Sequence, residues 1–122
     1  MKSIRFMTTA IIAVISGVFA YAQTQAQSQT TSTKTETFKV LGSCDMCKER
    51  IEKAAKINGV NKAEWNNDTK ILTIVYSPSV VKSDDILRKV AEAGHDTEKF
   101  KASDEAYKSL PGCCKYERKS NL

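Results

Sequence analysis

The sequence predicts an α+β domain with a four-stranded antiparallel sheet and two helices on one face, spanning residues 36–101. Two observations predict this fold class. Four stretches with alternating or β-branched apolar residues, typical of strands, are separated by two stretches whose apolar residues recur every three or four positions, typical of helices. A short polar link joins the middle two strands, whereas the other connections are each long enough to contain a helix. The resulting order is β-α-β-β-α-β.

A short break separates the first strand from the first helix. Residues 36–41 alternate between apolar and polar side chains, as a half-buried strand does. Gly42 and Ser43 interrupt this alternation, so we expect the helix to begin near Ser43 or Cys44. Gly59, which can adopt a positive φ, is expected to end it. The apolar stripe expected along this helix comprises Cys47, Ile51, Ala54 and Ala55.

A hairpin and a second helix follow. Residues 60–65 and 71–76 predict two strands, and the cluster of Asn, Asp and Thr between them predicts a turn. We expect Ser83 to cap the second helix, Gly94 to end it, and a short last strand to cover residues 95–100. The apolar face expected for this helix comprises Ile86, Leu87, Val90 and Ala93. This order of elements is that of the ferredoxin-like sandwich, or split βαβ arrangement.

The N-terminus has the pattern of a signal peptide over residues 1–22. Lys2 and Arg5 supply positive charge, an apolar stretch follows, and Ala20-Tyr21-Ala22 fits a signal-peptidase site. The apolar stretch is shorter than the ~20 residues that a membrane-spanning helix needs. We therefore expect cleavage after Ala22, no stable membrane insertion, and export to the periplasm, or secretion where the cell has no outer membrane.

Two further segments flank the predicted domain. Residues 23–35 are polar and without apolar periodicity, so we expect a disordered linker there. Residues 102–122 form a tail, within which residues 103–110 have the pattern of a short capped helix. We expect this helix to dock on the domain, because Ile71 and Val75 would otherwise lie uncovered on the open face of the sheet.

The charge of the chain argues against one class of partner. The formal net charge is +5 at pH 7, and loss of Lys2 and Arg5 with the signal peptide would leave seventeen basic against fourteen acidic residues, or +3. So small a surplus, without a basic stripe interleaved with aromatic residues, does not predict nucleic-acid binding. The four cysteines instead indicate disulfides or the ligation of a soft metal.

Cys44 and Cys47 form a Cys-x-x-Cys pair at the predicted start of the first helix. A helix N-terminus stabilises thiolates through its free N–H groups and its positive dipole end. A thiolate serves as a metal ligand and also as a redox nucleophile, so the spacing leaves open a metal pair, a redox-active dithiol and a structural disulfide. A pair of soft thiolates favours Cu(I) or a similar ion over hard cations, and a structural zinc site would need four ligands.

The strand, the Cys-x-x-Cys loop, the helix and the remaining order of elements resemble the heavy-metal-associated domain family. The matching features are Cys44 and Cys47, Gly59-Val60 at the entry to the second strand, and Ala93-Gly94 before the last strand. The family includes copper chaperones, N-terminal domains of copper-transporting ATPases and periplasmic mercury-binding proteins. The resemblance implies that both sulfurs bind Cu(I) or a similar soft ion, and that the ion is transferred by exchange with a partner's thiolates.

Two positions depart from the pattern of that family. The family loop usually reads Gly-Met-x-Cys, whereas here it reads Leu41-Gly42-Ser43-Cys44, so the Met that normally packs beneath the loop is missing. The residue after Gly94 is usually aromatic or Lys-like, whereas here it is His95, the only histidine. Because its loop would lie near the cysteine loop, His95 is a candidate metal ligand or hydrogen-bond partner of a thiolate. The alternative is an exposed loop histidine.

Cys113 and Cys114 lie in the tail, outside the region of resemblance. Adjacent cysteines rarely bond to each other without strain. They could supply further ligands to the metal at the first pair, hold a second metal, form disulfides with the first pair, or do none of these. Four cysteines allow three pairings, and the sequence does not choose among them.

The leading hypothesis is an exported copper chaperone or scavenger that binds Cu(I) at Cys44 and Cys47. It is not expected to be an enzyme, because no acid–base pair or nucleophilic triad is visible. The expected partners are the metal ion and a thiolate-bearing acceptor such as a metal-transporting ATPase. The alternatives are a thiol–disulfide oxidoreductase, in which Cys113 and Cys114 resolve the first pair, and a Hg(II), Zn(II) or cadmium binder on the same scaffold.

Overall fold

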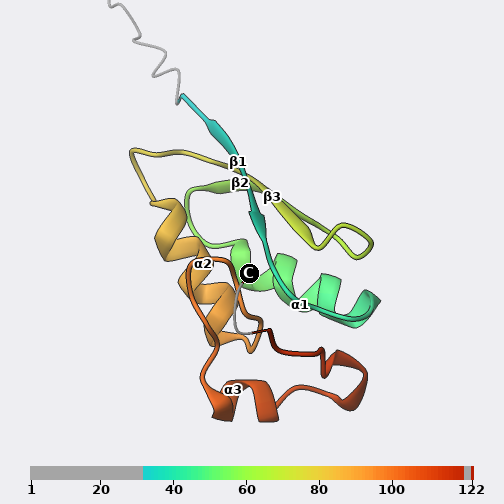
Figure 1. The fold of residues 1–122 in the computed structure, drawn as a ribbon. Helices are drawn as coiled ribbons and strands as arrows, with labels where there is room; N and C mark the ends of the chain where they lie inside the picture. The colour runs from blue at the N-terminus through green and yellow to red at the C-terminus, as the bar shows by residue number, and fades with distance from the viewer. Residues whose placement is uncertain (1–31, 120–121) are drawn as a thin grey trace, which may run out of the picture.

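The computed structural model describes residues 32–119 and 122 of the chain (Figure 1). The predicted signal peptide and most of the predicted linker lie outside these residues. Within the described part, no helix is long and apolar enough to cross a membrane. The elements in chain order are β1 (Lys34–Lys39), α1 (Asp45–Ala55), β2 (Val60–Asn66), β3 (Ile71–Tyr76), α2 (Ser83–Glu92), α3 (Asp104–Lys108) and the short 3-10 helix η1 (Gly112–Cys114).

The three strands form one antiparallel sheet in the order β1-β3-β2. The central strand is β3, whose Leu72 pairs with Phe38 of β1 and with Trp65 of β2. The predicted hairpin of β2 and β3 is therefore confirmed, and β1 pairs on the other side of β3. The α+β class, the two helices and the antiparallel sheet also agree with the prediction. The described residues contain three strands, however, and not the four that were expected.

The fourth strand, predicted over residues 95–100, is reduced to a single bridge between Val40 and Thr97. Two backbone hydrogen bonds still hold this segment beside the end of β1. Pairing stops there because Thr97 turns the chain. Its N–H and its hydroxyl both donate to the carbonyl of Phe100, and its hydroxyl oxygen accepts from the N–H of Phe100. A side chain that binds the nearby backbone in this way competes with a sheet ladder.

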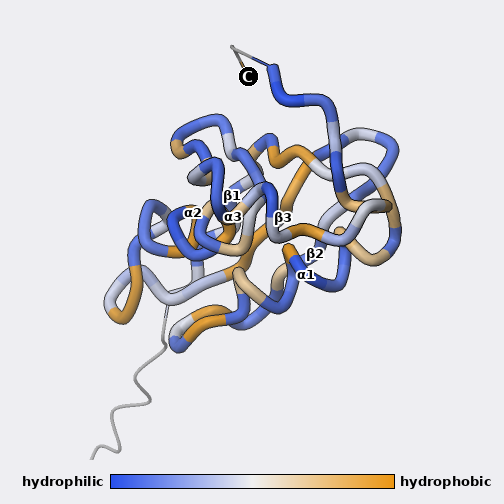
Figure 2. The backbone as a smooth tube through the Cα atoms, turned by 90° about the horizontal axis from the view of Figure 1, so that it is seen from below, coloured by the Kyte–Doolittle hydropathy of each residue, from blue (hydrophilic) through white to orange (hydrophobic). Residues whose placement is uncertain are grey.

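The hydrophobic core lies between the sheet and the two longer helices. Along β3, Leu72, Ile74 and Tyr76 are buried while the alternate residues Ile71 and Val75 are half-buried, so one face of the sheet is covered and the other is open. In Figure 2 hydrophobic stretches run through the middle of the domain, and others lie at its margin. Each buried aliphatic side chain contributes about 1.5–3 kcal/mol. The buried helical residues are Cys47, Ile51, Ala55, Ile86, Leu87, Val90 and Ala91.

The predicted end of the second helix at Gly94 is confirmed, whereas the first helix ends at Ala55, before the predicted stop at Gly59, and two predicted starts are shifted. Gly94 has a φ of 104°, as a chain that turns out of a helix often requires. Gly59, with a φ of 92°, lies instead in the turn after α1, in which the N–H of Val60 donates to the carbonyl of Ile57. The helix α2 begins with Ser83 itself, so Lys82 and not Ser83 occupies the N-cap position. The strand β1 begins at Lys34, inside the predicted linker, because its ladder with β3 extends that far.

The C-terminal segment, residues 102–119, is docked on the domain, but beside Gly94 and α1 and not over Ile71 and Val75 as expected. Ser103 caps α3 by accepting a hydrogen bond from the N–H of Ala106. Leu110 is buried and packs against Gly94 at the end of α2. Figure 1 shows α3 and the residues after it at the end of the domain where α1 begins. The segment therefore packs beside the cysteine loop and leaves the open face of the sheet uncovered.

Replacing Gly94 with Ala should lower the free energy of unfolding. An L-residue is strained at a φ of 104°, and the added Cβ would lie 2.8 Å from the carbonyl oxygen of Ala106 in the docked α3. We expect a loss of about 1–3 kcal/mol in denaturant-induced unfolding. Gly112→Ala is the matched control, because nothing lies within 4 Å of its Cβ position. Equal losses in the two variants would contradict this packing.

Candidate metal centre

Cys44 and Cys47 are brought together at the start of α1. Cys44 is the N-cap residue, with an extended backbone, and Cys47 lies in the first turn. Their sulfurs are 3.4 Å apart, so the two side chains face one small volume, as the spacing predicted. Cys47 is fully buried, whereas Cys44 is only partly buried. The pair therefore has one buried and one accessible member.

A third sulfur, that of Cys114 in η1, joins this pair. It lies 3.7 Å from the Cys44 sulfur, and all three sulfurs lie within 4.8 Å of one another. Cys114 is fully buried. In the part of the chain that the structure describes, no other set of three or more Cys, His, Asp or Glu side chains brings its ligand atoms together in this way. We call Cys44, Cys47 and Cys114 the three-sulfur group.

The thiols of this group differ in acidity. Burial alone would raise the pKa of Cys44, but hydrogen bonds from the N–H of Cys47 and from the neighbouring thiols outweigh it and lower this pKa to about 7. Burial raises the pKa of Cys114 well above its ordinary value, and its hydrogen bonds to the sulfurs of Cys47 and Cys44 raise it further. Although no capping hydrogen bond of regular geometry forms, Cys44 stands at the positive end of the α1 dipole. Thiolate character is therefore favoured on Cys44.

The cysteine loop is supported from beneath by Trp65 of β2. The indole N–H donates to the carbonyl of Val40 at 3.0 Å, and a Cβ on Gly42 would lie 2.9 Å from Cη2 of the ring. The indole thus fills the space into which a side chain at position 42 would point. The N–H of Ser43 in turn donates to the Cys47 sulfur at 3.4 Å.

Cys113 lies beside the three-sulfur group but does not belong to it. Its side chain is exposed, and its sulfur is 3.7 Å from the thioether sulfur of Met46. Its carbonyl accepts a hydrogen bond from the hydroxyl of Ser43, which fastens η1 to the cysteine loop. The two adjacent tail cysteines therefore differ: Cys114 faces the other sulfurs and Cys113 faces solvent.

His95 lies outside the three-sulfur group, and it is not an exposed loop residue either. It is fully buried, and its Nδ1–H donates to the carbonyl of Leu41 at 2.9 Å. Its ring stacks on that of Tyr116, with centroids 5.7 Å apart. Burial lowers the pKa of His95 and the charge of Arg50 lowers it further, against the opposing effect of the bond to Leu41. Through its hydrogen bond to Leu41, the ring holds the backbone just before the cysteine loop.

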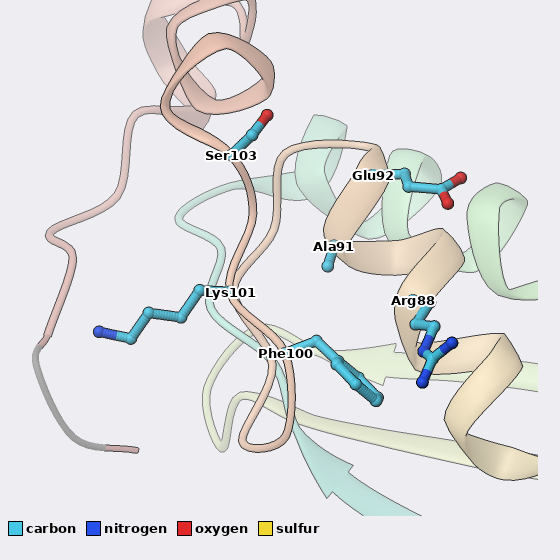
Figure 3. A pocket seen from close by; sticks show the side chains of 6 residues that line it. All are labelled: Arg88, Ala91, Glu92, Phe100, Lys101 and Ser103. Atoms are coloured by element: carbon cyan, nitrogen blue, oxygen red, sulfur yellow. The ribbon is translucent and has the colours of Figure 1, made fainter.

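A separate pocket lies between α2 and residues 100–103. Figure 3 shows Phe100 and Arg88 facing each other there, while Lys101 points away. The Arg88 guanidinium lies 5.0 Å from the centre of the Phe100 ring. The lining residues are Arg88, Ala91, Glu92, Phe100, Lys101 and Ser103. Because these include no cysteine or histidine, the three-sulfur group remains the candidate site.

The fold and the three-sulfur group together define a small metal-binding domain of the α+β class. The model of the heavy-metal-associated domain family matches residues 37–96. The copper chaperone CopZ of Staphylococcus epidermidis is 36% identical over 55 residues, which make up 44% of this chain and 81% of that protein. The chain belongs to the heavy-metal-associated domain family. This membership agrees with the prediction of a metal-binding protein and not an enzyme.

Two copper-transporting ATPases show how far the similarity extends. The copper-exporting P-type ATPase of Staphylococcus saprophyticus is 35% identical over 57 residues, which are 46% of this chain but 7% of the ATPase. The chain therefore spans a small part of that relative. The N-terminal domain of a potential copper-translocating P-type ATPase from Bacillus subtilis, solved in the Cu(I)-loaded state, has a TM-score of 0.52 at 31% identity and covers 54% of this chain and 85% of that domain. The family match ends at Asp96, so Cys113 and Cys114 lie outside it.

The sequence predicted that the sulfurs of Cys44 and Cys47 lie together, but it did not predict which other cysteine joins them. Cys44 and Cys47 lie at the helix start, as predicted, but nothing in the sequence distinguished Cys114 from Cys113. The support from Trp65 was also missed. The glycine at position 42 was an available signal for it, because a loop without its usual side chain needs another residue to fill the space.

The packing of Gly42 on Trp65 can be measured with a double-mutant cycle. Gly42→Ala should lower the free energy of unfolding by about 1–3 kcal/mol, because the new methyl group overlaps the indole. In a Trp65→Phe background the same change should cost less, since the shorter side chain withdraws the ring atoms that face Gly42. The measurement is denaturant-induced unfolding of all four proteins. Purely additive losses would show that the two residues are not in this contact.

Proposed function

We propose that the protein binds Cu(I) outside the cytoplasm, as a chaperone or scavenger, through the sulfurs of Cys44 and Cys47. The observation that carries this proposal is the pair itself: two sulfurs 3.4 Å apart at a helix N-terminus. Soft thiolates prefer Cu(I) to hard cations, and the helix terminus stabilises the thiolate that the ion requires. The copper chaperone and the Cu(I)-loaded ATPase domain among the similar proteins support Cu(I) as the cargo.

The unequal burial of the two sulfurs fits a protein that acquires and releases its cargo. Cys44 is accessible and its pKa is lowered to about 7, so a thiolate is available there for the first contact with an incoming ion. Cys47 is fully buried and retains the ion from the protein side. A partner's thiolate would therefore approach from the side of Cys44 and replace the protein's sulfurs one at a time.

The proposed partner is a protein that carries thiolates of its own, such as a metal-transporting ATPase. The likeness to one domain of a copper-exporting ATPase supports this kind of partner. The location outside the cytoplasm is supported by the signal-peptide pattern of residues 1–22. In such a compartment free thiols tend to oxidise, so the pair would stay functional only when reduced or loaded with metal.

Replacing both Cys44 and Cys47 with Ser should abolish tight Cu(I) binding, because a hydroxyl is a poor ligand for a soft ion. The protein is purified reduced and without oxygen, and is titrated with Cu(I) against a competing chelator. We expect the affinity to fall by at least about 100-fold, beyond what loss of a supporting group alone usually costs.

Cys113→Ser is the matched control for this titration, because Cys113 is an exposed thiol outside the three-sulfur group. It should bind Cu(I) as the parent does. If the double variant binds as tightly as the parent, the proposal fails. Rapid disulfide exchange with a model substrate, in a parent that does not bind Cu(I), would instead identify an oxidoreductase.

A further inference from the structure

We propose that Cys114 is a third ligand of the same ion, so that the C-terminal segment converts a two-sulfur site into a three-sulfur site. This inference rests on the proposed binding of Cu(I) at Cys44 and Cys47. It assigns the segment beyond the family domain a specific task, which is to deliver and hold one sulfur. The consequence is a protein that retains its ion more strongly than a two-cysteine domain would.

The distances between the sulfurs fit three-fold coordination. Metal–sulfur bonds of about 2.3 Å place the sulfurs of a trigonal centre ~4.0 Å apart, whereas a linear centre with two sulfurs would need ~4.6 Å. The sulfur of Cys44 lies 3.4 Å from that of Cys47 and 3.7 Å from that of Cys114. All three lie within 4.8 Å of one another. These separations are closer to those of a trigonal centre than to that of a linear one.

The position of Cys114 is fixed by anchors on both sides of it in the chain. On the N-terminal side, Leu110 is buried against Gly94. On the C-terminal side, the hydroxyl of Tyr116 donates to the carbonyl of Gly94 at 2.7 Å and accepts from the N–H of Asp96 at 2.8 Å. With both anchors in place, the Cys114 side chain is held inside the domain.

A second anchor on the C-terminal side is ionic. The Nε and Nη2 atoms of Arg118 donate to the two carboxylate oxygens of Asp96 at 2.9 and 2.8 Å, and Nη2 also donates to the carbonyl of Ala102 at 2.7 Å. A two-pronged pair of this kind fixes geometry as well as charge. Because the Asp96 carboxylate is fully buried, its pair with Arg118 ties the C-terminal segment to the interior of the domain.

The neighbouring candidates for a third ligand are less well placed. Cys113 is exposed and its sulfur contacts the Met46 thioether. His95 donates its Nδ1–H to the carbonyl of Leu41, and although its Nε2 has no hydrogen-bond partner, neither ring nitrogen belongs to the three-sulfur group. The structure therefore distinguishes two adjacent cysteines, and this distinction can be tested with matched single substitutions.

The test is X-ray absorption spectroscopy of the Cu(I)-loaded protein, compared with Cys114→Ser and Cys113→Ser. We expect three sulfur neighbours about the ion in the parent and in Cys113→Ser, and two in Cys114→Ser. In chelator competition, Cys114→Ser should bind Cu(I) about 10-fold or more weakly, the size of effect that loss of one supporting group already produces. Two sulfur neighbours in the parent, or no change in Cys114→Ser, would overturn the inference.

The outcome separates this inference from the function on which it rests. A parent that does not bind Cu(I) refutes the proposed function, whereas a parent that binds Cu(I) through two sulfurs refutes only the role of Cys114. Tyr116→Phe provides a variant that keeps all three sulfurs and loses the hydroxyl anchor. It should retain three sulfur neighbours but release Cu(I) severalfold faster to a two-thiol chelator. An unchanged release rate would show that the segment does not control retention.

Discussion

The buried carboxylate of Asp96 is the point on which the arrangement of the site depends. Its side chain is fully buried, and an unpaired charge in that position would be strongly destabilising. Arg118 neutralises it, and the N–H of Ala102 also donates to it. The backbone carbonyl of the same residue accepts from the N–H of Leu41, immediately before the cysteine loop. One residue therefore ties the C-terminal segment to the chain that carries Cys44.

The hydrogen bonds of Asp96 and its neighbour Thr97 also account for the missing fourth strand. A fourth strand would have used the backbone of residues 95–100 for a ladder beside β1. Here the N–H of Asp96 binds the hydroxyl of Tyr116, and Thr97 binds the backbone of Phe100. These bonds end the pairing after the bridge from Val40 to Thr97. Residues 95–100 therefore do not pair as a strand, and they instead form contacts that hold the C-terminal segment in place.

The sequence predicted those features that depend on local patterns and missed those that depend on contacts between distant residues. Periodicity was sufficient for both helices, the hairpin and the central strand, because each is specified by its own apolar spacing. The dihedral freedom of glycine marked the end of α2 at Gly94, but α1 ends at Ala55, before Gly59. The position of Cys114 could not be read in this way, because it depends on Tyr116 binding residues about twenty positions away. The burial of His95 was missed for a similar reason, since its partner Leu41 lies 54 residues earlier.

The three sulfurs are held by elements that differ in how easily they can move. Cys47 lies in the first turn of α1 and is fully buried in the core. Cys114 is equally buried, but it is held by a short segment whose anchors are a few hydrogen bonds, one ion pair and the side chain of Leu110. Neither Tyr116 nor Arg118 belongs to a strand or a helix of the described chain, so these two anchors lie outside the sheet. If Cys114 is the third ligand as proposed, displacement of this segment would leave Cys44 and Cys47 in place, and an ion held through three sulfurs would then be offered through two.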